Sequence, residues 1–167
     1  MNPAPSSPNI IAVLARQPDA VAHVRGSSEY PGISGTIAFY QTPSGVLVSA
    51  ELFGLPHSTQ PCPSHVFGFH IHSGSHCSGN TTDLFSDTLT HYNPRNCPHP
   101  FHAGDLPPLF ENNGHAVLVV LTNRFSVREI LGKTVVIHSD PDDFVSQPAG
   151  NAGKKIACGQ IASPPKK

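Results

Sequence analysis

Short segments in which apolar and polar residues alternate recur along the chain, and turn-forming residues separate them. In residues 46–53 every even-numbered position is apolar, whereas Ser49 and Glu51 occupy the other face. Because successive side chains of a strand point to opposite faces, this alternation predicts a strand with one buried face. Residues 33–40 also alternate and lead into a turn at 43–45, so the two segments predict a β-hairpin. Further strands are expected over residues 21–26, 66–72, 116–121, 134–138 and 156–161.

Three segments depart from this alternation. Residues 116–121 are apolar on both faces, as in a central strand, and residues 126–131 are a weak helical candidate of a turn or two. Residues 73–114 show little periodicity, many turn formers and most of the chemically interesting side chains. A loop of this length in a compact domain is usually functional or disordered, and metal binding would give it a reason to be ordered.

The composition favours one all-β domain. The 18 prolines and 14 glycines interrupt the chain too often for long helices, and 167 residues are enough for a domain with a real core. We therefore predict an antiparallel β-sandwich or barrel that forms a single domain over residues 10–162. The proline-rich residues 1–9 and the tail 163–167 are expected to be disordered.

Charge and hydropathy argue against two kinds of partner. The net charge is −1, there is no basic stretch beyond Lys166 and Lys167, and no apolar run could span a bilayer. Neither a nucleic-acid nor a membrane partner is therefore expected.

No secretory signal is visible, because the first apolar run, at residues 10–15, is short and no positive charge precedes it. A cytoplasmic location is expected, or a secreted or periplasmic one if a signal has been removed.

The four cysteines, at positions 62, 77, 97 and 158, allow three pairings. They contain no Cys-x-x-Cys pair, which argues against a cysteine-rich zinc ribbon. Four unpaired thiols in a reducing cytosol remain the alternative at this point.

Seven side chains have the types and spacing of two metal sites that share one ligand. His70 and His72 lie one residue apart on a predicted strand and point to the same face, an arrangement that suits Cu(II), and His138 at the end of another strand can complete this set. Three imidazoles and a carboxylate on the long loop form a plausible closed tetrahedral zinc set: His91, His99, His102 and Asp105. Two ions with four ligands each need eight positions, so His91 is expected to bind both metals through its two ring nitrogens.

A single histidine is more often a surface or hydrogen-bonded residue than a ligand, and the chain has 11. That ordinary role is assigned to the histidines outside the two sets: His23, His57, His65, His76 and His115.

Five motifs occur in order along the chain: GFHIH at 68–72, HYNP at 91–94, HPFHAGDL at 99–106, VVIH at 135–138 and GNAGKKIACG at 150–159. In this order they resemble the copper/zinc superoxide dismutase family, and the loop between positions 77 and 91 is long, as in bacterial members. The resemblance covers residues 20–161 and implies an eight-stranded antiparallel Greek-key β-barrel. It implies copper on His70, His72, His91 and His138, and zinc on His91, His99, His102 and Asp105.

The resemblance also implies residues around the metals. Asp142 matches a carboxylate that hydrogen-bonds one copper ligand and one zinc ligand, here His70 and His99. Cys77 and Cys158 match the family disulfide. The two remaining cysteines, Cys62 and Cys97, are expected to form a second bridge across the zinc loop, with two free thiols as an open alternative.

Lys155 is a departure from the family pattern, which has an arginine beside the copper at this position. Lysine keeps the positive charge but loses the planar fork of donors, so we expect anion docking with a lower rate. The segment between His138 and Lys155 lacks a charged insert, so long-range steering is expected from Lys154, Lys155 and other surface cations.

The resemblance implies a superoxide dismutase that converts superoxide to dioxygen and hydrogen peroxide, with His91 and Lys155 as catalytic residues and His91 as a proton carrier. The subunit is expected to be a monomer or a homodimer. The alternative is a copper and zinc storage or delivery protein with the same fold, for which the complete ligand set would also serve, although delivery proteins usually favour exposed Cys or Met ligands.

Overall fold

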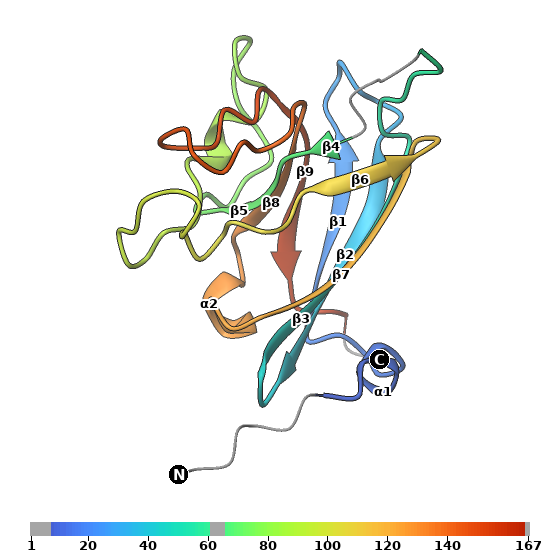
Figure 1. The fold of residues 1–167 in the computed structure, drawn as a ribbon, viewed down its shortest axis with the longest axis vertical. Helices are drawn as coiled ribbons and strands as arrows, with labels where there is room; N and C mark the ends of the chain where they lie inside the picture. Colours follow the sequence, from blue (N-terminus) through green and yellow to red (C-terminus); the bar gives the residue numbers. More distant parts are fainter. Residues whose placement is uncertain (1–7, 61–65, 166–167) are drawn as a thin grey trace.

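Nine antiparallel strands form one continuous sheet in the computed structural model, which describes residues 8–60 and 66–165 (Figure 1). The strands are β1 Ala20–Gly26, β2 Ser34–Thr42, β3 Gly45–Phe53, β4 Val66–Phe67, β5 Phe69–His72, β6 Leu109–Asn112, β7 His115–Thr122, β8 Thr134–His138 and β9 Lys155–Ala162. Three short helices accompany them: α1 Ile10–Leu14, η1 Ser86–Thr88 and α2 Val127–Ile130. The strand order is β4-β6-β7-β3-β2-β1-β9-β8-β5. The predicted all-β antiparallel class is confirmed.

The sheet closes into a nearly complete barrel because its two edge strands, β4 and β5, are neighbours in the sequence. The single strand expected over residues 66–72 is interrupted at Gly68, so that β4 pairs with β6 while β5 pairs with β8. The Gly68 N–H donates to the Asp140 carbonyl and its carbonyl accepts from His138 N–H, both at 2.8 Å. A Cβ at Gly68 would lie 2.8 Å from the Ala152 Cβ, which explains the glycine. The expected count of eight strands is therefore one short.

The predicted hairpin is confirmed by β2 and β3, which pair from Ser34 opposite Phe53 to Thr42 opposite Gly45. The alternating apolar side chains of both strands enter the barrel, where Ile37, Phe39 and Val48 are fully buried. The interior is thus filled by side chains, and the chemistry must lie outside the barrel wall.

Some local expectations were wrong. Residues 73–114 contain β6 as well as loop, and the apolar run at the start forms α1, with Asn9 accepting a hydrogen bond from Ala12 N–H as its cap. α1 begins at Ile10, the first residue of the predicted domain. Residues 1–7 and 166–167 lie outside the described residues, so the disorder expected at the two ends stays a prediction. β7 is paired on both edges, but its outward side chains are exposed: Val117, Val119 and Leu121. The helical turn expected over 126–131 is confirmed by α2.

Candidate metal centre

Two neighbouring strands carry the first group of histidines. His70 and His72 lie on β5, and His138 is the last residue of β8, the strand paired with β5. The period of two along β5 directs both imidazoles to the same face, while Ile71 between them is fully buried. His70 and His72 therefore share one face of β5, as the alternation predicts, and His138 lies close to them.

The long loop runs along the free edge of β5 and brings His91 to this face. Tyr92 N–H donates to the Ile71 carbonyl at 2.8 Å, and Ile71 N–H donates to the Gly104 carbonyl at 2.9 Å. A Cβ at Gly104 would lie 2.2 Å from the Ile71 carbonyl oxygen, so glycine is needed for this close approach. Backbone pairing with β5 thus orders the part of the loop that carries His91.

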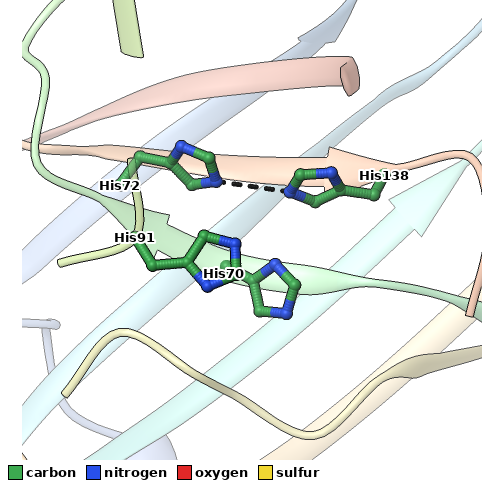
Figure 2. A group of neighbouring side chains, drawn as sticks. All are labelled: His70, His72, His91 and His138. Atoms are coloured by element: carbon green, nitrogen blue, oxygen red, sulfur yellow. Dashed lines mark hydrogen bonds between the residues drawn. The ribbon is translucent and has the colours of Figure 1, made fainter. Parts of the chain in front are cut away.

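The first group consists of four buried imidazoles: His70, His72, His91 and His138 (Figure 2). One ring nitrogen of each lies within 4.8 Å of those of the others. The ring centroids of His70 and His91 are 4.0 Å apart, and the Nε2 atoms of His72 and His138 are 3.2 Å apart. Four imidazole nitrogens converging on a small volume form a donor set that suits copper.

The second group shares His91 with the first and is also buried: His91, His99, His102 and Asp105. Asp105 is its centre, because its Oδ1 lies 2.8 Å from His91 Nδ1 and 3.3 Å from His102 Nδ1, and its Oδ2 lies 3.1 Å from His99 Nδ1. Three imidazoles with one carboxylate match the donor types of a closed zinc site.

Buried nitrogens without partners test whether metals would fit these groups. Among the described residues, four buried ring nitrogens have no hydrogen-bond partner: His70 Nδ1, His91 Nε2, His99 Nδ1 and His102 Nδ1. The short distances from His99 and His102 to Asp105 therefore lack hydrogen-bond geometry, as expected if these atoms converge on a point between them. An unpaired buried polar atom is costly, and a metal ion would remove that cost at all four. The residues fit two ions that share His91, with Nδ1 on the Asp105 side and Nε2 on the side of the first group.

The protonation states also fit metal binding. Burial and the neighbouring imidazoles hold the pKa of His72 well below its ordinary value and lower the pKa of His138 to about 3. Burial likewise lowers the pKa values of His70 and His102. At His70 the hydrogen bond to Asp142 opposes this effect. Burial raises the pKa of Asp105, but the hydrogen bond from His91 and the charges of the three neighbouring histidines together outweigh it and leave that pKa below its usual value. Neutral imidazoles and an ionised carboxylate are the forms that coordinate metals.

Asp142 forms a hydrogen bond with one histidine of each group. Its Oδ2 lies 2.7 Å from His70 Nε2, and its Oδ1 lies 2.9 Å from His99 Nε2, the two hydrogen bonds expected of this residue. Burial raises the pKa of Asp142, but these bonds and one from Phe144 N–H lower it far more, so the carboxylate is ionised. A Cβ at Gly150 would lie 2.0 Å from Oδ1. The glycine of the GNAG motif therefore leaves the space in which Asp142 fixes both rings.

Lys155 lies beside the first group but is not free. It lines a pocket of about 350 Å³ together with His72, His91 and His138. Its Nζ donates to Asp83 Oδ2 at 2.8 Å and to the Phe85 carbonyl at 3.1 Å, and its side chain is only 15% exposed. This partner was not predicted, because Asp83 lies 72 residues away on the long loop and no sequence signal links the two.

Lys154, the other cation expected to steer anions, also has a carboxylate nearby. Its Nζ lies 3.9 Å from Glu29 Oε2 at the surface. Each of the two lysines therefore has an acidic neighbour.

Arg124 is a second residue that the sequence did not reveal. Its Nη1 lies 3.1 Å from the Pro100 carbonyl, 3.3 Å from the His102 carbonyl and 3.0 Å from the Asp105 carbonyl. It follows β7 in the sequence, and nothing local distinguishes it from other surface arginines. One guanidinium nitrogen thus holds the backbone of the loop segment that carries two members of the second group.

The cysteines divide into one bonded pair and one free thiol among the described residues. Cys77 and Cys158 form a disulfide with 5.6 Å between their Cα atoms, which ties the long loop to β9. Cys97 is free, and the Asn93 side chain bonds its backbone N–H and carbonyl. A free Cys97 is what the alternative of two unpaired thiols expects. Cys62 lies outside the described residues, so its pairing stays a prediction.

Comparisons with known proteins agree with this geometry. The family model described as copper/zinc superoxide dismutase (SODC) matches residues 33–161. "Superoxide dismutase [Cu-Zn] 2" of Aquifex aeolicus is 35% identical over 158 residues, covering 86% of this chain and 87% of the relative. "Superoxide dismutase [Cu-Zn]" of Legionella pneumophila is 30% identical over 160 residues, covering 91% and 92%. Within the described ranges, no helix has the length and apolar character needed to cross a membrane.

Proposed function

The chain belongs to the copper/zinc superoxide dismutase family, and on that premise we propose that it dismutates superoxide at a copper site that shares His91 with a structural zinc site. The observation that carries the proposal is the pair of buried groups with one common imidazole and four unpartnered nitrogens. The proposed copper ligands are His70, His72, His91 and His138, and the proposed zinc ligands are His91, His99, His102 and Asp105. Because the donor set is complete, the proposal does not rest on the fold alone.

Copper in this set would supply the one-electron oxidation and reduction by which two superoxide anions and two protons become dioxygen and hydrogen peroxide. His91 has the position to move a proton. Its Nδ1 is held by Asp105 at 2.8 Å, whereas its Nε2 faces the first group without a partner. A proton at Nε2 can therefore be given to an anion in the adjacent pocket while the ring stays held at Nδ1, on the side of the second group.

Neighbouring groups keep the other rings in place. His72 Nδ1 donates to the Leu89 carbonyl at 3.0 Å, which leaves Nε2 to face His138. Asp142 holds the Nε2 edges of His70 and His99, so that their Nδ1 atoms face the two metal positions. Such hydrogen bonds fix the tautomer and orientation of each ring, raise its basicity as a ligand and reduce the ordering needed when a metal binds.

Lys155 gives the pocket a positive group for the anionic substrate. Its Nζ has three hydrogens, of which Asp83 and Phe85 accept two, so one remains for an anion. We assign it short-range docking of superoxide.

An oxidising compartment, such as the periplasm or the extracellular space, is favoured over the cytoplasm. The Cys77–Cys158 disulfide spans 81 residues of sequence, and structural disulfides persist mainly in oxidising compartments. Alkylation followed by mass spectrometry, on protein isolated without reductant, would detect two blocked cysteines; a fully alkylated protein would contradict this assignment.

The function is tested by following superoxide decay directly with protein that contains one copper and one zinc per chain. We expect fast, copper-dependent decay that is lost in His138→Ala and retained in His115→Ala, a surface histidine stacked on Phe53. Tight copper binding with decay no faster than the metal-free protein would instead favour a storage or delivery role.

A further inference from the structure

Asp83 is an acidic residue beside the proposed anion pocket, and it faces Lys155. We propose that Asp83 is a positioning residue that fixes the Lys155 ammonium at the pocket wall and cancels its charge at a distance, so that Lys155 docks an anion at short range without attracting it from afar. The inference rests on the proposed function, since it concerns how the same site receives an anionic substrate.

The contact geometry supports the positioning role. A lysine side chain is a flexible point charge without the planar fork of an arginine. Here two acceptors fix it, Asp83 Oδ2 at 2.8 Å and the Phe85 carbonyl at 3.1 Å. Asp83 is itself held, because its Oδ1 accepts from Phe85 N–H at 3.0 Å and its N–H donates to the Asn80 side chain at 3.0 Å.

The loop that carries Asp83 is fastened to the strand that carries Lys155. The disulfide joins Cys77 to Cys158, three residues after Lys155 on β9. The ion pair therefore closes between two backbones that are already joined, which lowers the entropy cost of holding the lysine in one conformation.

The charge balance supports the cancelling role. A lysine and a carboxylate in contact have no net charge, so the pair attracts a distant anion only weakly. Water and salt weaken the remaining attraction further. Lys154, the residue before Lys155, lies 3.9 Å from Glu29 at the surface, so this second cation also has an acidic neighbour. The two lysines that the sequence suggested for steering are thus each next to an acidic group.

The test compares Asp83→Asn and Asp83→Ala in protein loaded with copper and zinc. Asparagine keeps an oxygen that can accept from Lys155 but removes the charge, whereas alanine removes both. The assays are kcat/KM for superoxide and the affinity for azide, titrated through the copper absorption, between about 10 mM and 1 M salt, where the screening length falls from about 30 Å to about 3 Å.

We expect Asp83→Asn to raise kcat/KM and azide affinity about twofold at low salt, the effect of one uncompensated charge at about 10 Å in water, and to match the unsubstituted protein at high salt. We expect Asp83→Ala to fall below it at high salt, because Lys155 is no longer held. Asp87→Asn is the matched control: it removes the same charge from the same loop, where Asp87 accepts from Ser78 Oγ, and we expect a smaller change.

Two results would overturn the proposal. An Asp83→Asn profile that matches the unsubstituted protein at every salt concentration would show that Asp83 does not cancel the lysine charge. Equal losses in both Asp83 variants at high salt, with normal metal content, would show that the carboxylate serves the fold alone. If the unsubstituted protein does not dismutate superoxide, the proposed function fails, but the azide titrations still decide the role of Asp83.

Discussion

Arg124 provides a sharp test of how the fold prepares the second metal group. The change is Arg124→Ala, which removes the guanidinium that contacts the carbonyls of Pro100, His102 and Asp105. Arg124 makes no contact with a side chain of the metal groups in these bonds. Any effect on zinc must therefore pass through the backbone of the loop.

The size of the effect follows from the hydrogen bonds. Nη1 has two hydrogens for three acceptors, so two bonds are complete at any time. A hydrogen bond from a charged donor contributes about 1.5–3 kcal/mol, and water competes for an exposed side chain such as Arg124. We therefore expect a loss of about 1–2 kcal/mol in the ordering of the loop, which corresponds to roughly 5- to 30-fold in zinc affinity.

The assay is competition for zinc with a coloured chelator, and copper affinity is measured in parallel. Arg128→Ala on α2 is the matched control, because it removes an exposed arginine from the same part of the chain. Copper affinity should change less than zinc affinity, since Arg124 contacts the segment that carries only the second group. Equal zinc affinities in the two variants would show that pairing with β5 and the metal itself order the loop. Arg124 would then make no contribution to that order.

Three further predictions concern the supports of the site. Asp142→Asn should lower the affinities for copper and zinc together by about 10- to 100-fold, because it weakens the link to one imidazole of each group; a change confined to one metal in chelator titrations would contradict a shared role. Replacing Cys77 and Cys158 by serine should lower the free energy of unfolding by up to about 4.5 kcal/mol, the loop-closure value for this separation, and denaturant titrations that differ by less than about 1 kcal/mol would refute a stabilising role. The pKa of His138 is lowered to about 3 in the folded protein, so between about pH 6.5 and pH 3 the unfolded chain binds a proton that the folded chain does not. The metal-free protein should therefore lose stability as the pH falls through this range. An unfolding free energy that stays constant over the range would argue against a neutral, buried imidazole.

Much of the metal centre could be predicted because strand periodicity is local. Alternation of side chains along β5 directs His70 and His72 to one face wherever the strand lies in the fold. The spacing of the loop ligands and the motif resemblance then indicated which residues to group with them. The groups that the structure assembles are those two sets.

The interruption at Gly68 could not be predicted in the same way. Residues 66–72 have the composition of one strand, and only the closed barrel requires its two halves to pair with opposite ends of the sheet. The exposed face of β7 has a similar cause: pairing on both edges does not decide whether another layer covers a strand. Cys97 remained ambiguous because disulfide pairing cannot be read from spacing.

The fold class, the alternation of the main strands and the side chains grouped as possible metal ligands could all be predicted, because each depends on residue type and on periodicity over a few positions. The contact of Asp83 with Lys155 and the contacts of Arg124 with the loop of the second group appear only in the folded protein. Those contacts join residues that are far apart in the chain, and their formation depends on how the barrel closes and where the disulfide fastens the loop. Charges and hydrogen bonds act over a few ångströms, so their partners become fixed only when the backbone has brought them together.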